Sequence, residues 1–279
     1  MEINKIYLGD SLELIKQLPD NFIDLVITSP PYSDVKSYGQ DVSVLHPDHF
    51  AEWLLQYNNE VFRVLKTTGS FILNINDKII NKQRHIYVMD YTVRSVKETQ
   101  LKLYDTYIWH KQSCLPNSSE KRLNNDIEYI FHFVKDPEKV KWNMDDVREP
   151  YTESSLNRIK SQLKTYETDE TGKKISKGSK MCTLNPAGRV PSVVFRFQNN
   201  QVSRGNAHPA PFAVELVSWF IKALTDKDDT VLDIFLGSGT TAEAALLLGR
   251  KFIGFEINEN YIKMAQDRIS HLLLRDKYF

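Results

Sequence analysis

The feature that most constrains the fold of this chain is a succession of short apolar runs, rich in β-branched residues, that alternate with segments of helical periodicity. Such runs are typical of strands buried on both faces of a parallel sheet. Six of them are found at residues 23–28, 70–75, 104–109, 127–134, 230–235 and 251–256. Helical periodicity is found at residues 47–65, 209–224, 240–248 and 259–274. The alternation predicts an α/β fold, a doubly wound and mostly parallel sheet with helices on both faces. In the second helix we expect the prolines, Pro209 and Pro211, in the first turn.

Residues 136–206 break this pattern, because they are polar and show no sustained period. So long an irregular segment inside an α/β domain is usually functional or disordered rather than architectural. We therefore predict an inserted lobe that recognises the substrate. Residues 151–204 contain ten Lys or Arg residues and four Asp or Glu residues, although the whole chain has a formal net charge of zero. This distribution is compatible with a local basic surface, although an ordinary solvated face is the alternative, and the total charge gives no support to a nucleic-acid partner.

The composition also indicates where the protein works. No run of 18 or more apolar residues is present, so we expect no membrane-spanning helix. The first five residues, Met-Glu-Ile-Asn-Lys, do not resemble a secretion signal. The two cysteines, Cys114 and Cys182, are far apart, which fits a reducing compartment and argues against a structural zinc site. A cytoplasmic protein without a bound metal is the expectation.

A glycine-rich turn lies near the C-terminus, where a strand that contains Asp233 continues into Phe235-Leu236-Gly237-Ser238-Gly239-Thr240-Thr241 and then a helix. Glycines let the backbone turn tightly and approach a ligand, and the helix N-terminus supplies free N–H groups. The next strand ends at Glu256, nineteen residues after Gly237, where a carboxylate can bind two ribose hydroxyls. The pattern predicts an adenosine-containing cofactor. By itself it does not distinguish NAD from S-adenosylmethionine, and a tight turn without a ligand remains the alternative.

A second motif, Thr28-Ser29-Pro30-Pro31-Tyr32, follows the predicted strand at residues 23–28. Open α/β sheets bind ligands at this carboxyl edge. Two successive prolines restrict the backbone to an extended course and thereby fix the relation between the Ser29 hydroxyl, the Pro30 carbonyl and the Tyr32 ring. The alternative interpretation is a proline-rich strand exit with a packed tyrosine.

Taken together, these motifs resemble the β group of DNA amino-methyltransferases, in which the catalytic tetrapeptide precedes the cofactor turn. Ser29-Pro30-Pro31-Tyr32 resembles the [DNS]-P-P-[YFW] motif of that family, and the glycine turn resembles its F-x-G-x-G motif. Four further segments are similar to family segments in the same order: residues 8–11, 108–111, 125–135 and 207–212. The likeness covers residues 5–135 and 205–275.

The resemblance implies a permuted, Rossmann-like methyltransferase sheet with S-adenosyl-L-methionine as the cofactor. Residues 1–135 would form the catalytic part, residues 136–206 a target-recognition insertion and residues 207–279 the cofactor-binding part. Ser29, Pro30, Pro31 and Tyr32 would be catalytic. The residues implied to bind the cofactor or shape its site are Asp10, Thr28, His208, Pro209, Asp233, Phe235, Gly237, Ser238, Gly239, Thr240, Thr241 and Glu256. The loop at residues 33–45 is a candidate to close over the base.

The reaction implied is methylation of an exocyclic amine on a base flipped out of double-stranded DNA. Serine at the first motif position favours cytosine N4, as in restriction-modification enzymes, and aspartate is typical of adenine N6 enzymes. Neither cysteine follows a proline, which disfavours cytosine C5 methylation.

Other interpretations stay open: an adenine N6 enzyme, an RNA methyltransferase, a catalytically silent DNA-binding protein and an NAD-dependent dehydrogenase. A cognate restriction endonuclease and a homodimer are partners that the sequence leaves undecided.

Overall fold

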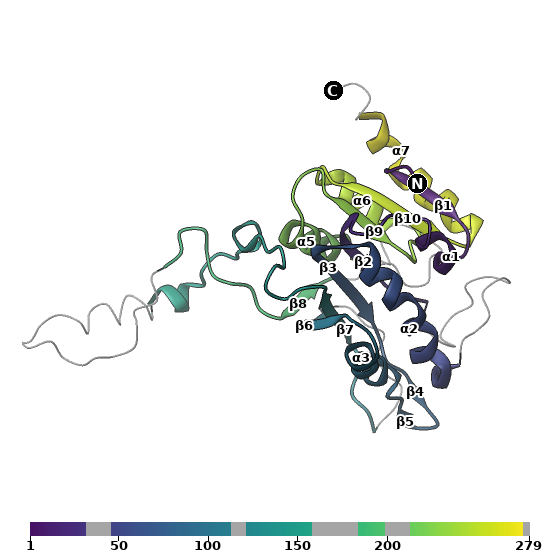
Figure 1. The fold of residues 1–279 in the computed structure, drawn as a ribbon. Helices are drawn as coiled ribbons and strands as arrows, with labels where there is room; N and C mark the ends of the chain where they lie inside the picture. Colours follow the sequence, from purple (N-terminus) through teal and green to yellow (C-terminus); the bar gives the residue numbers. More distant parts are fainter. Residues whose placement is uncertain (32–45, 113–120, 158–183, 199–212, 276–279) are drawn as a thin grey trace, which may run out of the picture. The chain divides into compact units, whose positions relative to one another are not determined.

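Most of the described chain is organised around one eight-stranded sheet (Figure 1). The computed structural model describes residues 1–31, 46–112, 121–157, 184–198 and 213–275. The chain divides into a larger unit, Met1–Trp142 with Val193–Phe279, and a smaller unit, Asn143–Ser192. Strands β1, β10, β9, β2, β3, β7, β6 and β8 lie side by side in that order within the larger unit.

Only β7 runs against the other seven strands of this sheet. It pairs antiparallel with both of its neighbours, whereas all remaining pairs are parallel. The bounds of the eight strands are β1 Lys5–Leu8, β2 Ile23–Thr28, β3 Leu65–Ile75, β6 Lys102–Lys111, β7 Ile127–Val134, β8 Val194–Phe197, β9 Thr230–Asp233 and β10 Lys251–Glu256. The predicted mostly parallel α/β sheet is confirmed. The expectation that residues 127–134 form a parallel strand is wrong, because a run buried on both faces has the same composition in either direction.

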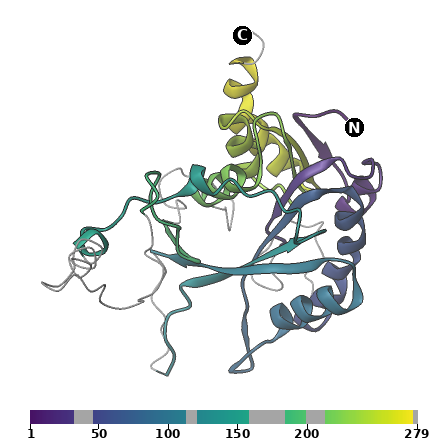
Figure 2. The same ribbon diagram turned by 60° about the vertical axis from the view of Figure 1, so that its left-hand side comes forward.

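Helices cover both faces of the sheet, as Figure 2 shows. Their bounds are α1 Ser11–Ile15, α2 Pro47–Val64, α3 Tyr87–Glu98, α5 Val214–Leu224, α6 Thr240–Leu247 and α7 Glu259–Arg275. Helix α5 begins at Val214, and the two prolines expected in its first turn, Pro209 and Pro211, lie outside the described residues. None of the helices in the described part of the chain is long and apolar enough to cross a membrane.

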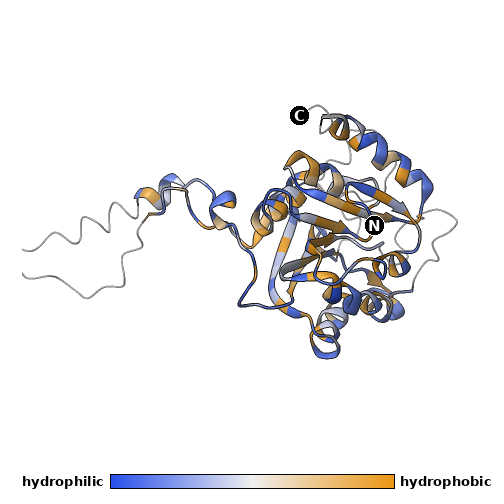
Figure 3. Cartoon of the chain, turned by 45° about the horizontal axis from the view of Figure 1, so that its top comes forward, coloured by the Kyte–Doolittle hydropathy of each residue, from blue (hydrophilic) through white to orange (hydrophobic). Residues whose placement is uncertain are grey.

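The apolar core lies between the sheet and these helices. On one face, side chains of α2 such as Phe50 and Val61 pack with Val26, Phe71 and Ile253 of the strands. Figure 3 shows this pattern as hydrophobic colour along the central strands and hydrophilic colour along the outer side of α7. The hydrophobic residues of each strand therefore reach both helical layers, which explains why their sequence runs are continuous.

The smaller unit overlaps the predicted insertion but has different bounds. Its described residues include a 3-10 helix, Met144–Val147, and an antiparallel bridge between Glu149 and Arg189. Strand β8 belongs to the predicted insertion by sequence, yet it pairs with β6 at the edge of the main sheet. The role of residues 136–206 in target recognition stays a prediction.

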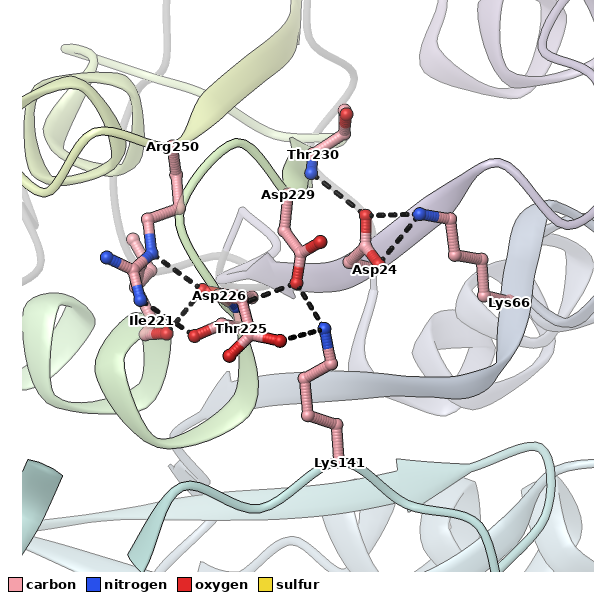
Figure 4. Close-up of polar contacts among 9 residues, drawn as sticks. All are labelled: Asp24, Lys66, Lys141, Ile221, Thr225, Asp226, Asp229, Thr230 and Arg250. Carbon is pink, nitrogen blue, oxygen red and sulfur yellow. Dashed lines mark hydrogen bonds and ion pairs between the residues drawn. The ribbon is translucent and has the colours of Figure 1, made fainter. Parts of the chain in front are cut away.

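Polar contacts join neighbouring strands of the sheet near the amino ends of the parallel strands (Figure 4). The Lys66 ammonium donates to both carboxylate oxygens of Asp24 at 2.8 Å, and the Thr230 amide donates to the same carboxylate at 3.0 Å. Lys141, which follows β7, pairs with Asp229 at 2.6 Å and with Asp226 at 2.8 Å. The described residues of the proline motif, Ser29, Pro30 and Pro31, follow β2 at the opposite, carboxyl edge of the parallel strands.

Candidate active site at the carboxyl edge of the sheet

The glycine-rich turn connects β9 to α6 with a backbone that favours glycine. Gly237 and Gly239 have φ angles of 53° and 84°. A Cβ atom on Gly239 would lie 2.7 Å from the Cβ of Ala265 in α7, so the turn also packs too closely there for a side chain. Gly239 is the N-cap of α6 and provides no side-chain cap. The first turn of this helix therefore presents its positive dipole end to the carboxyl edge.

Asp233 links this turn to the strand that carries the proline motif. Its carboxylate is buried and accepts hydrogen bonds from the Thr28 hydroxyl at 2.6 Å, the Thr241 hydroxyl at 2.6 Å and the Phe235 amide at 3.0 Å. Burial raises the pKa of Asp233 to about 6, although these hydrogen bonds oppose the shift. The residue thus holds the ends of β2 and β9 and the start of α6 in one arrangement.

Glu256 lies beside the same turn, at the end of β10. Its two carboxylate oxygens accept from the Gly237 amide and from the Asn258 amide, each at 2.8 Å. Burial raises the pKa of Glu256. Each carboxylate oxygen can accept more than one hydrogen bond, so the residue has acceptor capacity for hydroxyl groups of a ligand.

Asp10 begins α1 at the end of the neighbouring strand. One of its carboxylate oxygens accepts from the Leu12 amide at 2.8 Å and from the Glu13 amide at 3.2 Å, as an N-cap does. The Ser11 hydroxyl donates to the Ile234 carbonyl at 2.6 Å. The start of α1, just after β1, is therefore joined to the end of β9 near the glycine turn.

The proline motif leaves the sheet next to this cluster. Thr28 and Pro30 are buried, while Ser29 and Pro31 are half-buried. Three predicted site residues, Tyr32, His208 and Pro209, lie outside the described residues, and so does the loop at residues 33–45. The structure brings the other predicted residues together at one edge, and their roles stay predictions.

Two aromatic residues of α2, Trp53 and Tyr57, contact the glycine turn. The Trp53 ring stacks on Phe235 of the glycine turn with 5.5 Å between ring centroids, and the Tyr57 ring meets Phe235 edge-on at 5.2 Å. Burial and the nearby charge of Asp10 raise the pKa of Tyr57. A wall of the candidate cofactor site therefore comes from α2, and helical periodicity could not separate this role from ordinary packing.

A buried polar network at the same edge was also not predicted. The Lys111 ammonium donates to Glu128 at 2.8 Å, and the Asn74 amide donates to the other oxygen of Glu128 at 2.5 Å. These residues lie on β6, β7 and β3. The sequence signal was present, because Lys111 and Glu128 both fall in segments that resemble the family.

The donor set fits an adenosine-containing cofactor. A cradle that excludes side chains, an uncapped helix N-terminus and the Glu256 carboxylate lie together at the ends of neighbouring strands, where α/β sheets bind such groups.

Comparison with known proteins identifies the family. Residues 23–267 match the family model described as DNA methylase. The type II methyltransferase M.PvuII of Proteus hauseri is 30% identical, over 94% of this chain and 82% of its own length. The DNA adenine methyltransferase YhdJ of Escherichia coli K12 is 27% identical, over 96% of this chain and 83% of its own length.

Solved structures give the same result. The PvuII DNA methyltransferase, described as cytosine-N4-specific, superposes with a TM-score of 0.72 and 26% identity, and covers 95% of this chain and 85% of that one. TTHA0409 of Thermus thermophilus, a putative DNA modification methylase solved with S-adenosyl-L-methionine, shares the fold with a TM-score of 0.60 at 20% identity, and covers 96% of this chain and 95% of that one. The predicted family resemblance is confirmed: the chain belongs to the DNA methylase family, whose members are S-adenosyl-L-methionine-dependent methyltransferases.

Proposed function

We propose that this protein transfers a methyl group from S-adenosyl-L-methionine to N4 of a cytosine flipped out of double-stranded DNA. The observation that carries the proposal is the hydrogen-bonded connection through Asp233, which joins Thr28 at the proline motif to Thr241 in the cofactor turn. This connection fixes the catalytic segment against the turn that would hold the methyl donor. Such positioning supplies much of the rate enhancement in a transfer between two bound groups.

The cofactor supplies an electrophilic methyl group bound to a sulfonium. The residues that would hold it are Asp10, Phe235, Gly237–Thr241 and Glu256, together with His208 and Pro209. Glu256 would accept from the ribose hydroxyls, and Asp10 would accept from the adenine amine. Trp53 extends this surface through its stacking on Phe235.

The proposed catalytic residues act on the amine of the base. The lone pair of an exocyclic amine is delocalised into the ring, which makes the nitrogen a poor nucleophile. The Ser29 hydroxyl and the Pro30 carbonyl would accept the two N–H groups and draw the lone pair out of that conjugation. Tyr32 would stack on the flipped base. None of these residues needs to form a covalent bond.

Two observations favour cytosine N4 over adenine N6. Serine occupies the first position of the motif, and the PvuII enzyme, similar over nearly the whole chain, is described as cytosine-N4-specific. The alternative is an adenine N6 enzyme, because YhdJ is named a DNA adenine methyltransferase. A hydroxyl can accept a hydrogen bond from either amine, so the geometry of Ser29 does not decide between them.

The test is mass spectrometry of nucleosides in DNA from a host that lacks amino methylation and expresses the intact protein. The Ser29→Ala variant is expressed in parallel, with Ser270→Ala as the matched control, because the exposed Ser270 hydroxyl donates only to the Asp267 carbonyl in its own helix. We expect N4-methylcytosine from the intact protein and the control, and none from Ser29→Ala.

Each other outcome has a defined meaning. N6-methyladenine would overturn the choice of base and keep the fold and cofactor. If the protein is folded and binds the cofactor but the DNA contains no modified base, the result would favour an RNA methyltransferase or a catalytically silent DNA-binding protein.

A cognate type II endonuclease is part of the proposal because M.PvuII is named a type II methyltransferase. Its test is whether the methylated DNA resists one such endonuclease.

A further inference from the structure

A second group of side chains lies at the carboxyl edge, beyond the residues of the proposed reaction. Strand β3 ends at Ile75 and leads into a hairpin of β4, Ile79–Ile80, and β5, Gln83–Arg84. Strands β6 and β7 are joined at the same edge, because Lys111 ends β6 and its amide donates to the Asp126 carbonyl at 2.7 Å. We call residues 76–85 and 121–126 together the basic rim.

The two parts of the basic rim contact each other. The Arg122 guanidinium donates to the Lys82 carbonyl at the tip of the hairpin, and the Asn125 amide donates to the Asn76 side chain at 3.4 Å. Both views of the fold show the hairpin and the described end of the β6–β7 connection extending from the same end of the sheet (Figures 1 and 2). The basic rim is thus one connected structure.

The hairpin tip has a defined backbone. Asn81 and Lys82 have φ angles of 48° and 63°, as the two central residues of a type I′ turn require. At the base of the hairpin, Arg84 pairs with the buried Asp77. Lys82, whose side chain is exposed, is therefore held at a fixed place in front of the sheet edge.

The composition of the basic rim suits a polyanion. It contains five Lys or Arg residues and two Asp residues, whereas the whole chain is neutral. Lys82, Lys121 and Arg122 are exposed, whereas the acidic Asp77 is buried and paired with Arg84, and Asp126 contacts the His110 ring at 3.3 Å. A duplex whose target base enters the site at Ser29 must pass its backbone over this edge of the sheet.

Leu123 is the unusual residue of the basic rim, because its exposed fraction is 93%. An isolated exposed leucine needs no explanation on an ordinary surface. Here it lies between Arg122 and Asn124, on the edge that carries the catalytic motif. Proteins that distort DNA insert apolar side chains between base pairs from such basic surfaces.

We propose that the basic rim binds the DNA duplex beside the target base and that Leu123 enters the space from which the base is flipped. Lys82 and Arg122 contact the phosphates, and the leucine side chain stacks against the neighbouring bases. The inference rests on the proposed DNA reaction, but it holds for either target base. Leu123 thereby offsets part of the energetic cost of unpairing the target base, although it does not touch the reacting atoms.

The experiment compares two duplexes that contain a site first mapped by sequencing DNA methylated by the intact protein. In one duplex the target base is paired, and in the other it faces an abasic position, so that it needs no unpairing. For Leu123→Ala we expect kcat/KM to fall about tenfold or more on the paired duplex, and to stay within about threefold of the intact protein on the other.

Two variants serve as controls. Leu247→Ala removes another exposed leucine, from the end of α6 near the amino end of β10. It should leave kcat/KM unchanged on both duplexes. Lys82→Ala should weaken binding to both duplexes equally and reduce the slope of log affinity against log salt by about one.

Three results would overturn the inference: an equal loss on both duplexes for Leu123→Ala, no loss on either, or a salt slope for Lys82→Ala that matches the intact protein. A basic rim that instead binds a protein partner would give the second and third of these results together. The identity of the methylated base is read from the product of the intact protein. A failure of the cytosine N4 proposal is therefore seen separately from a failure of this inference.

Discussion

His132 shows how a single buried residue can make stability depend on pH. It lies on β7 with no exposed surface, and its ring nitrogens contact the Ser70 hydroxyl at 2.9 Å and the Tyr107 hydroxyl at 3.1 Å. The Trp142 ring stacks on it with 5.9 Å between centroids. Burial lowers the pKa of His132 to about 3, so the folded protein keeps this imidazole neutral.

The sign of the pH dependence follows from this pKa. Between about pH 6.5 and pH 3 the unfolded chain binds a proton at His132 that the folded chain does not, so acidification destabilises the fold. From pH 7.5 to pH 5 we expect this residue to lower the free energy of unfolding by about 2 kcal/mol. Asp233 acts in the opposite direction, because its raised pKa favours proton uptake on folding as the pH falls.

Urea unfolding of the intact protein and of His132→Gln at both pH values checks this prediction. Because Gln does not titrate, the variant should lose less stability on acidification than the intact protein, whatever its stability at pH 7.5. Equal losses in the two proteins would show that His132 does not control the acid side of the profile.

Gly239 gives a prediction that separates backbone strain from close packing. Gly239→Ala forces a left-handed φ angle on alanine and brings its Cβ to 2.7 Å from the Ala265 Cβ. Gly249→Ala has the same kind of φ angle, 70°, but its nearest neighbour is a flexible Lys227 carbon at 3.5 Å. We expect a loss of about 1 kcal/mol for Gly249→Ala and about 2–4 kcal/mol for Gly239→Ala.

Thermal unfolding and cofactor titration measure these effects. Adding Ala265→Gly to Gly239→Ala should restore part of the stability, because it removes the overlapping atom and leaves the strain. If both glycine variants lose equal stability, the contact with α7 is not significant. Binding of S-adenosyl-L-methionine should weaken for Gly239→Ala alone, since Gly249 lies at the other end of α6.

At the scale of elements, the contacts that connect the proline motif to the glycine turn lie at the ends of the strands. The Asp233 carboxylate accepts hydrogen bonds from one hydroxyl of β2, one hydroxyl of α6 and one amide of the glycine turn. Thr28→Val keeps the shape of the side chain and removes the hydroxyl that Asp233 accepts. We expect a loss of stability of about 1–3 kcal/mol and a lower kcat, because the proline motif loses its connection to the turn.

Thr28→Ser is the matched control, since it keeps the hydroxyl and removes a methyl group. Unfolding curves and single-turnover rates of methyl transfer distinguish the two roles of Thr28. A Thr28→Val protein with reduced stability and an unchanged rate would mean that the hydrogen bond serves folding alone.

Sequence patterns predicted most of the long elements, and they missed elements of two kinds. Strands β1 and β8 and helix α1 have only four or five residues, too few for a period to be recognised. Helix α3 was missed although its buried residues recur at helical spacing, because Thr92 and Ser95 on the buried face are polar and Met89 and Val93 on the exposed face are apolar. The direction of β7 depends on how the chain returns to the sheet, which a run of apolar residues does not record.

The candidate site was more predictable than the fold around it, because glycines and prolines restrict the backbone locally. The residues that needed the structure are those brought in from elsewhere, such as Trp53 on Phe235 and Glu128 between Lys111 and Asn74. Each of these contacts joins separate elements. Resemblance to family segments could single out Lys111 and Glu128 but did not show that they contact each other.

On the scale of the whole molecule, the two edges of the sheet carry different kinds of polar group. At the amino edge, Lys66 and the Thr230 amide bind the buried Asp24 carboxylate, and Lys141 binds Asp226 and Asp229 (Figure 4). Those contacts hold strands together. At the carboxyl edge Glu128 also joins strands, but Asp10, Asp233 and Glu256 support turns beside the proposed cofactor site. Stability and activity should therefore respond to different substitutions.

Lys66→Met tests this separation. It removes the ammonium from a carboxylate whose side chain is 5% exposed, while Lys66 itself is partly exposed, so we expect a loss of stability of about 2 kcal/mol. The kcat should stay unchanged at a temperature where the variant is folded, because Asp24 is at the amino edge. Ser29→Ala should behave in the opposite way and show little methyl transfer at a temperature where it is folded. Lys16→Met, which breaks an exposed pair with Glu13, is the control for removal of a charge and should change neither quantity. A Lys66→Met protein that is folded but has lost kcat would show that the amino edge determines the geometry of the site across the whole sheet.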